Sequence, residues 1–324
     1  MVGSGRSETN GRRVTDCRPL VSVVVPMYQG RNWIASTLRS VASQTFTDFE
    51  ILIVDDGSTD NGHEEAQRVG IEEAVDLRVI RTENSGVAAA RNLGIEESRG
   101  EFVALLDADD LWHPLKLERQ LERLGHNGSP FCTCGYEFMD DRTGRRTAVV
   151  VHRGADGVLD RWLALEGNGL ALASTALVRR RAIDQLRRFD PTFSVSADLA
   201  FALRMAVLGS FDVVPDVLVR YRIHAGQMHR QVSGLASDLE RLHDQVFADG
   251  LDPAGERRCR ANLDAHMGYV HLRKGQIRRG LGYLWSAACR DSRRLVTVPI
   301  RAVSRRLRRW LRARLSRPLD GWVS

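Results

Sequence analysis

The sequence has no apolar run of the ~18 to 20 residues that a membrane-spanning helix requires, which excludes a multi-span membrane protein. Cysteine is scarce: five occur in 324 residues, and their odd number and spacing fit neither a disulfide framework nor a zinc site. We therefore expect reduced thiols, most of them buried. The five are Cys17, Cys132, Cys134, Cys259 and Cys289.

The first 19 residues contain charges but lack the apolar segment of a secretory signal. We interpret residues 1–19 as a disordered lead-in and expect a cytoplasmic protein. Lysine is also rare, with only Lys116 and Lys274, and neither lies in a Gly-rich Walker motif. Phosphoryl transfer from ATP therefore has no support in the sequence.

Charge is distributed unevenly along the chain. Residues 1–230 hold 28 Lys+Arg against 32 Asp+Glu (−4), whereas residues 231–324 hold 19 against 9 (+10), which together give the net +6. Hydrophobic residues at 43% and charged residues at 27% are ordinary for a globular protein. The sequence thus predicts a mildly acidic body with a basic tail.

From residue 20 onward, short apolar runs alternate with segments of helical periodicity, a pattern typical of βα units on a mostly parallel open sheet. The expected strands are residues 21–28, 50–54, 77–81, 101–106 and 217–224. The less regular stretch that follows residue 130 predicts exposed or edge strands at 131–138 and 147–152, a helix at 158–165 and strand character at 172–178. Helices are expected at 197–209, 236–248, 256–273 and 276–290.

Two clusters of acidic residues follow expected strands, where open α/β sheets bind their ligands. Asp55 and Asp56 follow the second strand, and Asp107, Asp109 and Asp110 follow the fourth. In an extended segment the single spacer places Asp107 and Asp109 on the same side, and two such carboxylates favour a hard cation, Mg²⁺ or Mn²⁺. The alternative for an isolated DxD is a solvated acidic loop or a helix cap.

Two long segments, VSVVVPMYQGRNWIASTLRSVASQTFTDFEILIVDDGSTDN and NSGVAAARNLGIEESRGEFVALLDADDLWHP, resemble the nucleotide-sugar-binding half of family 2 glycosyltransferases with the GT-A fold. The resemblance covers residues 20–125 and continues more weakly to about residue 228 through FDPTFSVSADLAFALRMAVLG and YRIHAGQ. It implies an α/β, Rossmann-like GT-A domain. We place that domain at 20–230, with a donor half (20–125) and an acceptor half (126–230), followed by an all-α extension (231–324).

The resemblance also implies which residues bind the nucleotide-sugar donor. Asp56 would bind the base, with Pro26 and Tyr28 lining the same pocket. Asp107 would approach the ribose and the sugar, and Arg91 would lie near the nucleotide.

Metal and catalytic roles follow from the same resemblance. Asp109 would bind the Mg²⁺ or Mn²⁺ that bridges the diphosphate. His224 either completes the metal shell, reaches the diphosphate, or is a strand-end histidine bonded to backbone. Asp198 matches the catalytic base of the family, although Ala197 replaces the usual Glu before it; otherwise Asp198 is an acid favoured by the helix dipole. Trp112 either covers the sugar or fills the core.

The basic tail has ten arginines and no acid between residues 292 and 319. On a helical wheel, apolar residues from Ile300 to Leu315 form one stripe, with most arginines opposite. Such a helix adsorbs to an anionic membrane surface, or its stripe packs on the protein and the arginines are solvated. The first interpretation implies a peripheral protein on the inner face of the plasma membrane.

Together these features predict an inverting, metal-dependent hexosyltransferase that uses a nucleotide-sugar, UDP-linked as the first candidate. The acceptor would be a glycan or lipid-linked hydroxyl in cell-envelope polysaccharide synthesis. Alternatives are a polyprenyl-phosphate sugar synthase, a non-catalytic nucleotide-sugar-binding protein, and a nucleic-acid-binding protein. The acidic body offers no basic groove, so we expect no specific nucleic-acid partner.

Overall fold

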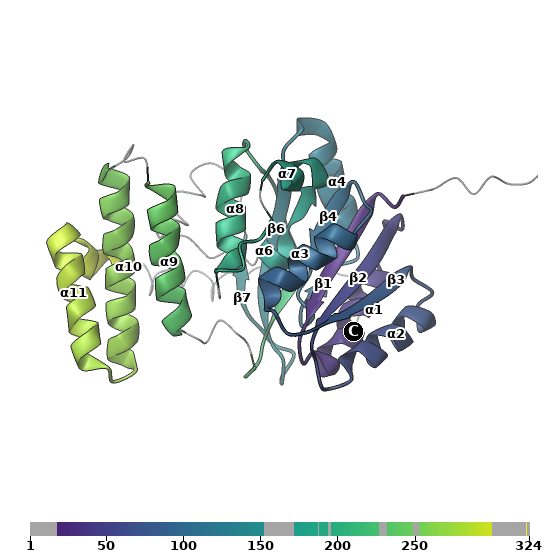
Figure 1. The fold of residues 1–324 in the computed structure, drawn as a ribbon, viewed down its shortest axis with the longest axis horizontal. Coiled ribbons are helices and arrows are strands. Elements are labelled where there is room, and N and C mark those ends of the chain that lie inside the picture. The colour runs from purple at the N-terminus through teal and green to yellow at the C-terminus, as the bar shows by residue number, and fades with distance from the viewer. Residues whose placement is uncertain are drawn as a thin grey trace, which may run out of the picture.

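The structure, a computed structural model, describes residues 18–151, 172–186, 188–193, 196–226, 232–248, 253–299 and 322. A nine-stranded sheet with helices on both faces forms its centre (Figure 1). The strands are β1 Val21–Met27, β2 Phe49–Asp56, β3 Leu77–Thr82, β4 Phe102–Leu105, β5 Leu111–Trp112, β6 Phe131–Asp140, β7 Arg146–Val150, β8 Leu177–Arg179 and β9 Asp212–Ile223. The helices are α1 Arg31–Ala42, α2 Gly62–Glu72, α3 Val87–Glu97, α4 Lys116–Asn127, α6 Leu172–Thr175, α7 Arg180–Gln185, α8 Ala197–Val207, α9 Val232–Val246, α10 Pro253–Arg273 and α11 Ile277–Asp291.

The strand order is β3-β2-β1-β4-β8-β6-β9-β5, with β7 paired to β6. Strands β1 to β4 are parallel, and β8 is antiparallel to both β4 and β6. Because β9 is parallel to β6, it runs in the same direction as β4. The carboxyl ends of β1, β2, β4, β6 and β9 therefore meet at one edge of the sheet, as the predicted GT-A architecture requires.

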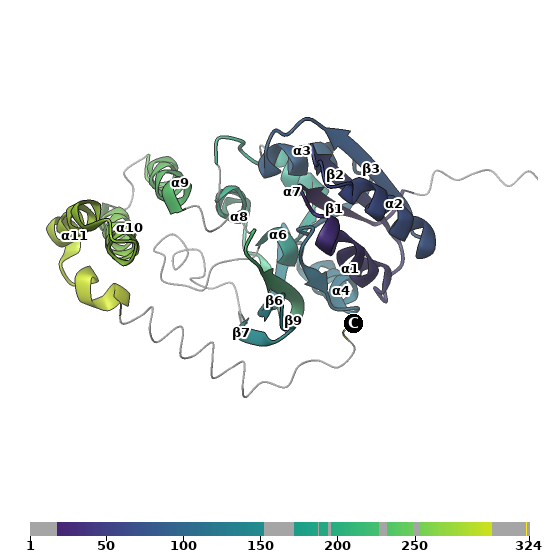
Figure 2. The same ribbon diagram turned by 90° about the horizontal axis from the view of Figure 1, so that it is seen from below.

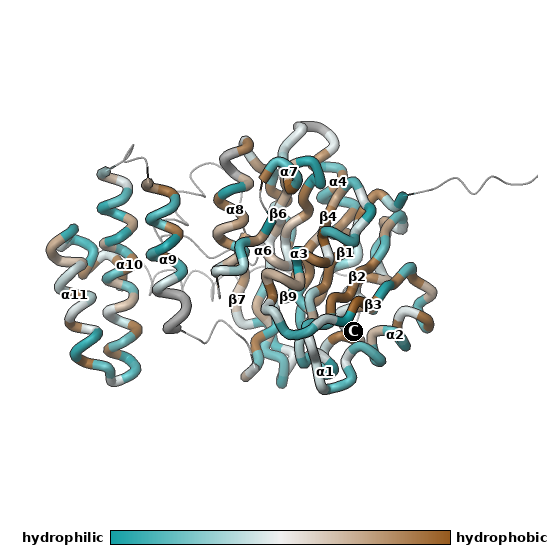
Figure 3. The backbone as a smooth tube through the Cα atoms, in the orientation of Figure 1, coloured by the Kyte–Doolittle hydropathy of each residue, from teal (hydrophilic) through white to brown (hydrophobic). Residues whose placement is uncertain are grey.

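Two apolar cores lie on opposite faces of the sheet. Successive residues of β1 alternate between them: Val23 packs with α1, α2 and α4, whereas Val24 packs with α3, α7 and α8. Apolar residues are concentrated in the central strands (Figure 3). The core that contains Val24 continues through Leu239 of α9 and Leu263 of α10. Helices α8, α9, α10 and α11 therefore form a row that extends from this face of the sheet (Figure 2).

The predicted helical extension is confirmed for residues 232–248 and 253–299. The boundary near residue 230 stays a prediction, and the predicted helix at 158–165 lies outside the described residues, as does the Arg-rich segment after residue 299. Among the helices that are described, none combines the length and the apolar character needed to cross a bilayer.

The prediction of an exposed or edge strand at 131–138 is wrong, because β6 lies between β8 and β9 and residues 131–137 are buried. Its polar residues have partners inside the protein. Thr133 Oγ1 lies 2.9 Å from Thr175 Oγ1, and Glu137 Oε1 accepts a 2.8 Å bond from Arg220 Nε. The alternation of polar and apolar residues in β6 suggests a solvent-exposed face, but its polar side chains form hydrogen bonds inside the protein. Residues 172–178 are also only partly a strand, since α6 precedes β8.

Candidate functional site

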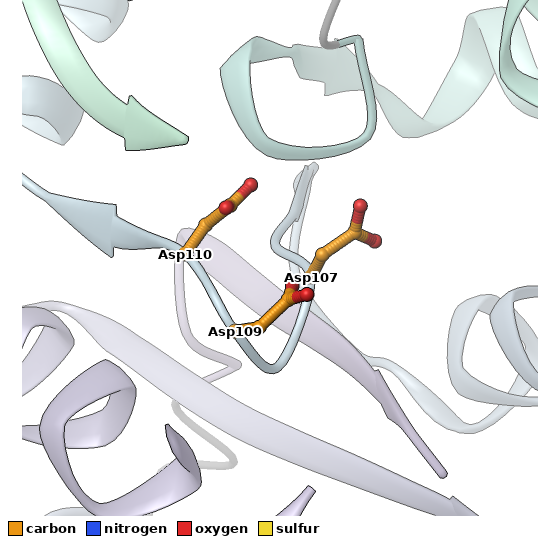
Figure 4. A group of neighbouring side chains, drawn as sticks. All are labelled: Asp107, Asp109 and Asp110. Atoms are coloured by element: carbon orange, nitrogen blue, oxygen red, sulfur yellow. The ribbon is translucent and has the colours of Figure 1, made fainter. Parts of the chain in front are cut away.

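Three carboxylates gather in the turn that follows β4 (Figure 4). One carboxylate oxygen each from Asp107, Asp109 and Asp110 lies within 4.8 Å of the others. The Asp110 amide donates to the Asp107 carbonyl at 3.1 Å, so the segment is a turn and not the extended strand that we expected. The predicted proximity of Asp107 and Asp109 is nevertheless found. Both side chains are partly exposed, while Asp110 is buried.

Asp110 ties this turn to two distant elements. Its Oδ2 accepts a bond from Ser174 Oγ of α6 at 2.5 Å, and its Oδ1 accepts one from the Arg222 amide of β9 at 3.1 Å. Ser174 Oγ in turn accepts the Asp107 N–H at 3.1 Å. Burial, with the charges of Asp109 and Asp107, raises the pKa of Asp110 well above its usual range. The sequence places Asp110 in the acidic cluster but indicates no role for it, and no local signal points to Ser174.

Arg91 connects α3 to this cluster. Its Nη2 lies 2.7 Å from Asp107 Oδ1, and the Arg91 side chain is buried. Burial raises the pKa of Asp107. The positive charge of Arg91 opposes this rise, and the negative charge of Asp109 adds to it. Arg91 and Asp107, which were each expected near the donor, are therefore in direct contact with one another.

His224 lies at the same edge, at the end of β9. Its Nε2 lies 2.8 Å from Asp109 Oδ2, and its Nδ1 accepts the Gly226 N–H at 3.2 Å. An Nδ1 that accepts a hydrogen bond assigns the proton of a neutral imidazole to Nε2, which then donates to Asp109. The two interpretations of His224 thus meet: it bonds to backbone and also faces the acidic cluster.

Trp33 of α1 positions this histidine, and sequence reasoning missed it. Its ring stacks on His224 with centroids 4.0 Å apart, and its Nε1 donates to Asp141 Oδ2 at 3.1 Å. Asp141 follows β6, so it lies at the same edge of the sheet. A tryptophan in an amphipathic helix gives no sign that it faces a site instead of the core.

Asp198 lies in the first turn of α8, where its Oδ1 accepts the Leu199 N–H at 2.8 Å. Burial raises its pKa to about 6, and the charge of Asp107 acts in the same direction while that of Arg91 opposes it. These interactions place Asp198 within electrostatic reach of the acidic cluster. The helix start is held by α9, because Asp238 Oδ2 accepts the Ser196 N–H and hydroxyl at 3.1 and 3.2 Å.

Asp56 is buried at the end of β2. Its Oδ1 accepts the Ser85 N–H at 2.8 Å and its Oδ2 the Gly86 N–H at 2.9 Å, so it fixes the loop that precedes α3. Pro26 is buried in β1 beyond the last residue paired with β4, where its missing N–H leaves no ladder bond unmade. Tyr28 follows β1 and is exposed.

Trp112 fills the core. Its side chain is fully buried and its Nε1 donates to the Ser174 carbonyl at 2.9 Å. Cys132 and Cys134 are buried strand residues with free thiols, as predicted. Cys259 is likewise buried, whereas Cys289 is exposed.

Residues 22–187 match the family described as Glycosyl transferase family 2, which is just over half of the chain. The chain belongs to glycosyl transferase family 2. Over 129 residues it is 42% identical to the putative teichuronic acid biosynthesis glycosyltransferase TuaG of Bacillus subtilis, a match that covers 39% of this chain and 50% of that protein. Over 242 residues it is 30% identical to the putative glycosyltransferase EpsH of the same organism, covering 72% of this chain and 66% of EpsH. The chain thus spans about half the length of TuaG, and 33% of an uncharacterized glycosyltransferase of Rickettsia bellii.

Solved structures of glycosyltransferases share the fold of this family 2 member. S. aureus TarS 1-349 in complex with UDP-GlcNAc has a TM-score of 0.63 at 19% identity, over 91% of this chain and 87% of that one. The mannosyltransferase PcManGT from Pyrobaculum calidifontis, in complex with GDP-Man and Mn²⁺, has a TM-score of 0.59 at 20% identity, over 90% and 81% of the two chains. Both likenesses concern the fold, and they confirm the predicted GT-A architecture with its C-terminal helices.

Proposed function

We propose that this glycosyltransferase is inverting and transfers a hexose from a nucleoside diphosphate sugar, UDP-linked as the first candidate, to a hydroxyl of a glycan or lipid-linked acceptor. One observation supports this most: Asp198, with a pKa of about 6, lies within electrostatic reach of Arg91 and Asp107 at the edge where the acidic cluster gathers. The named relative in teichuronic acid biosynthesis supports a role in cell-envelope polysaccharide synthesis.

The acidic cluster fits a divalent cation, Mg²⁺ or Mn²⁺. Its donors are carboxylate oxygens, which hard cations prefer, and two of the three carboxylates are partly exposed. Asp109 would hold the ion with Asp107, while both Asp110 oxygens accept internal hydrogen bonds. A bound cation stabilises the negative charge that develops on a departing diphosphate. With its proton on Nε2, His224 is better suited to donate a hydrogen bond to a diphosphate oxygen than to bind the metal ion.

Asp198 would act as the general base. An inverting transfer needs a carboxylate that takes the proton of the acceptor hydroxyl while that oxygen attacks the anomeric carbon from the face opposite the leaving group. A pKa of about 6 leaves most of the Asp198 carboxylate ionised at pH 7 and makes it a stronger base than an ordinary aspartate. Arg91 opposes the rise in the pKa of Asp107, and Asp56, Pro26 and Tyr28 would line the base pocket.

The test compares the full-length protein with Asp198→Asn and Asp109→Asn on a panel of UDP-, GDP- and dTDP-sugars with Mn²⁺. The Asp198→Asn variant should still bind the donor, and the bound donor should raise the melting temperature of the variant. The variant should nevertheless transfer sugar at least about 100-fold more slowly, the usual loss when a general base is removed. Asp109→Asn should lose the Mn²⁺ dependence of donor binding. Full transfer by Asp198→Asn would assign the base to another residue.

A matched control is Asp76→Asn, an aspartate directly before β3 at the opposite edge of the sheet, paired with Arg99. It should keep donor binding and transfer. Offering polyprenyl phosphate beside hydroxyl acceptors separates a polyprenyl-phosphate sugar synthase from the proposed activity, and transfer to the phosphate alone would replace the proposed acceptor class.

A further inference from the structure

The outer face of α11 presents large apolar side chains to solvent. Ile277, Leu281 and Trp285 are 61%, 57% and 74% exposed, and their spacing of four residues aligns them in one stripe. Val296, just beyond the helix, is 60% exposed. We call Ile277, Leu281 and Trp285 the α11 face; they are three of the eight large apolar side chains that are exposed in the described part of the chain.

The opposite side of α11 packs on α10 through two glycines and an alanine together with Leu284, which lies against Gly268 of α10. Gly280 of α11 meets Gly268 of α10 so closely that a Cβ on Gly280 would lie 3.0 Å from the Gly268 carbonyl oxygen and 2.7 Å from Leu272. Ala287 is also buried. Helices usually bury their large apolar residues, whereas α11 packs Leu284 against α10 and leaves three others exposed.

Polar bonds hold α11 in this orientation. Asp264 Oδ2 of α10 accepts bonds from Ser286 Oγ at 2.7 Å and from Arg290 Nε at 3.0 Å. The Tyr269 hydroxyl donates to the Leu295 carbonyl at 2.6 Å. Rotating the helix to bury its apolar stripe would break these contacts, so the exposure of the stripe is a property of the packing.

The charge around the α11 face is almost entirely positive. Residues 274–299 contain six cations and one acid, Asp291, which is ion-paired with Arg294. Five of the cations are exposed: Lys274, Arg278, Arg279, Arg293 and Arg290, the last of which is ion-paired with Asp264 of α10.

We propose that the α11 face docks on the surface of an anionic lipid bilayer, with Trp285, Leu281 and Ile277 entering the interface and the arginines at the headgroups. A second copy of the chain is a poorer occupant, because a two-fold contact of this face with itself would bring arginines against arginines. Nucleic acid would pair with the cations but leave the aliphatic stripe in water. An anionic bilayer satisfies both features. This proposal is independent of the proposed sugar transfer and of the Arg-rich segment after residue 299.

The test is flotation of the full-length protein with vesicles of phosphatidylethanolamine and phosphatidylglycerol, against phosphatidylcholine vesicles. The variant is Leu281→Gln with Trp285→Gln. Its matched control is Ile71→Gln with Val246→Gln, two exposed apolar residues on α2 and α9. Wild type and control should bind the anionic vesicles and not phosphatidylcholine, and the α11 variant should bind at least tenfold more weakly with an unchanged melting temperature.

A second measurement needs no change to the apolar stripe. Cys289 is exposed at the end of α11, so an environment-sensitive fluorophore attached there in a Cys17→Ser chain should shift to the blue on adding anionic vesicles. Equal vesicle binding by wild type and the α11 variant, or no binding by either, overturns the proposal. So does a wild-type dimer that the variant converts to a monomer without any lipid dependence, which would assign the face to contact between copies.

Discussion

At the scale of single residues, the site is a set of carboxylates whose proton affinities differ because their surroundings differ. Asp110 is buried and bonded internally, Asp107 is paired with Arg91, and Asp198 lies at a helix start, where its Oδ1 accepts the Leu199 N–H. Burial raises the pKa of all three, and for Asp198 it raises the pKa to about 6, near the pH at which a general base works best.

The pH profile of transfer tests this assignment. Because the base must be ionised, kcat/KM should rise about tenfold per pH unit below pH 6 and level off above it, with the lower limb reporting the Asp198 pKa of about 6. The measurement is initial rate against pH with subsaturating donor and acceptor. A limb near pH 4 would instead indicate an ordinary, solvated carboxylate.

Stability gives an independent check of the same pKa. A carboxyl group whose pKa rises from 3.8 to about 6 on folding binds more protons in the folded state, so its contribution to stability falls as the pH rises from about 4 to 6 and stays low above that. Asp198→Asn should therefore raise the free energy of unfolding at pH 7 by about 1 to 3 kcal/mol and leave it nearly unchanged at pH 4. Denaturant unfolding at the two pH values measures the difference.

At the scale of elements, helices bring their side chains to the site only when they lie close enough to the sheet. Gly94 lets α3 rest on β1, since a Cβ there would lie 2.4 Å from Val24 Cγ1 and 3.2 Å from Val54 Cγ2. Arg91 lies three residues earlier on the same helix and reaches Asp107 at 2.7 Å. The close approach of α3 and the ion pair at the site are therefore linked.

Gly94→Ala should cost about 1 to 3 kcal/mol of stability, the usual cost of overpacking, and should weaken donor binding by displacing Arg91. Gly125→Ala in α4 is the control, because no atom lies within 4 Å of its added Cβ; it should gain about 0.5 to 1 kcal/mol from helix propensity. Chemical denaturation and donor titration measure both. Unchanged stability of Gly94→Ala would show that α3 can move away from the sheet without cost.

At the scale of the whole molecule, the helices beyond residue 231 share a core with the catalytic domain. Leu239, Leu242 and Leu263 belong to the same apolar cluster as Phe201 of α8, and Arg241 donates to the Thr192 carbonyl at 2.9 Å. Asp238 holds the start of α8 by accepting the N–H of Ser196, which lies two residues before Asp198. The helical extension thus stabilises the start of α8, where Asp198 lies.

Asp238→Ala should lower stability by about 1 to 3 kcal/mol, because it leaves the buried Ser196 N–H and hydroxyl unsatisfied. It should also lower kcat more than it raises the KM for donor, since the residues that we propose to bind the donor lie in 20–125. The control is Asp244→Ala on the same helix, whose exposed ion pair with Arg260 should contribute less than about 0.5 kcal/mol. Equal losses in the two variants would contradict a positioning role for Asp238.

Local signals in the chain were enough to predict most of the strands and helices and the acidic cluster after β4, whereas the interest of His224 came from the resemblance to the family. Apolar runs and turn residues are local features, and the parallel arrangement they imply brings strand ends to one edge. The position of β6, the role of Ser174 and the support of His224 by Trp33 came only from the folded chain. Their contacts join residues far apart: Asp110 is 64 positions from Ser174 and 112 from Arg222. Hydrogen bonds over such separations leave no periodic trace in the sequence, because packing of the whole sheet brings their partners together.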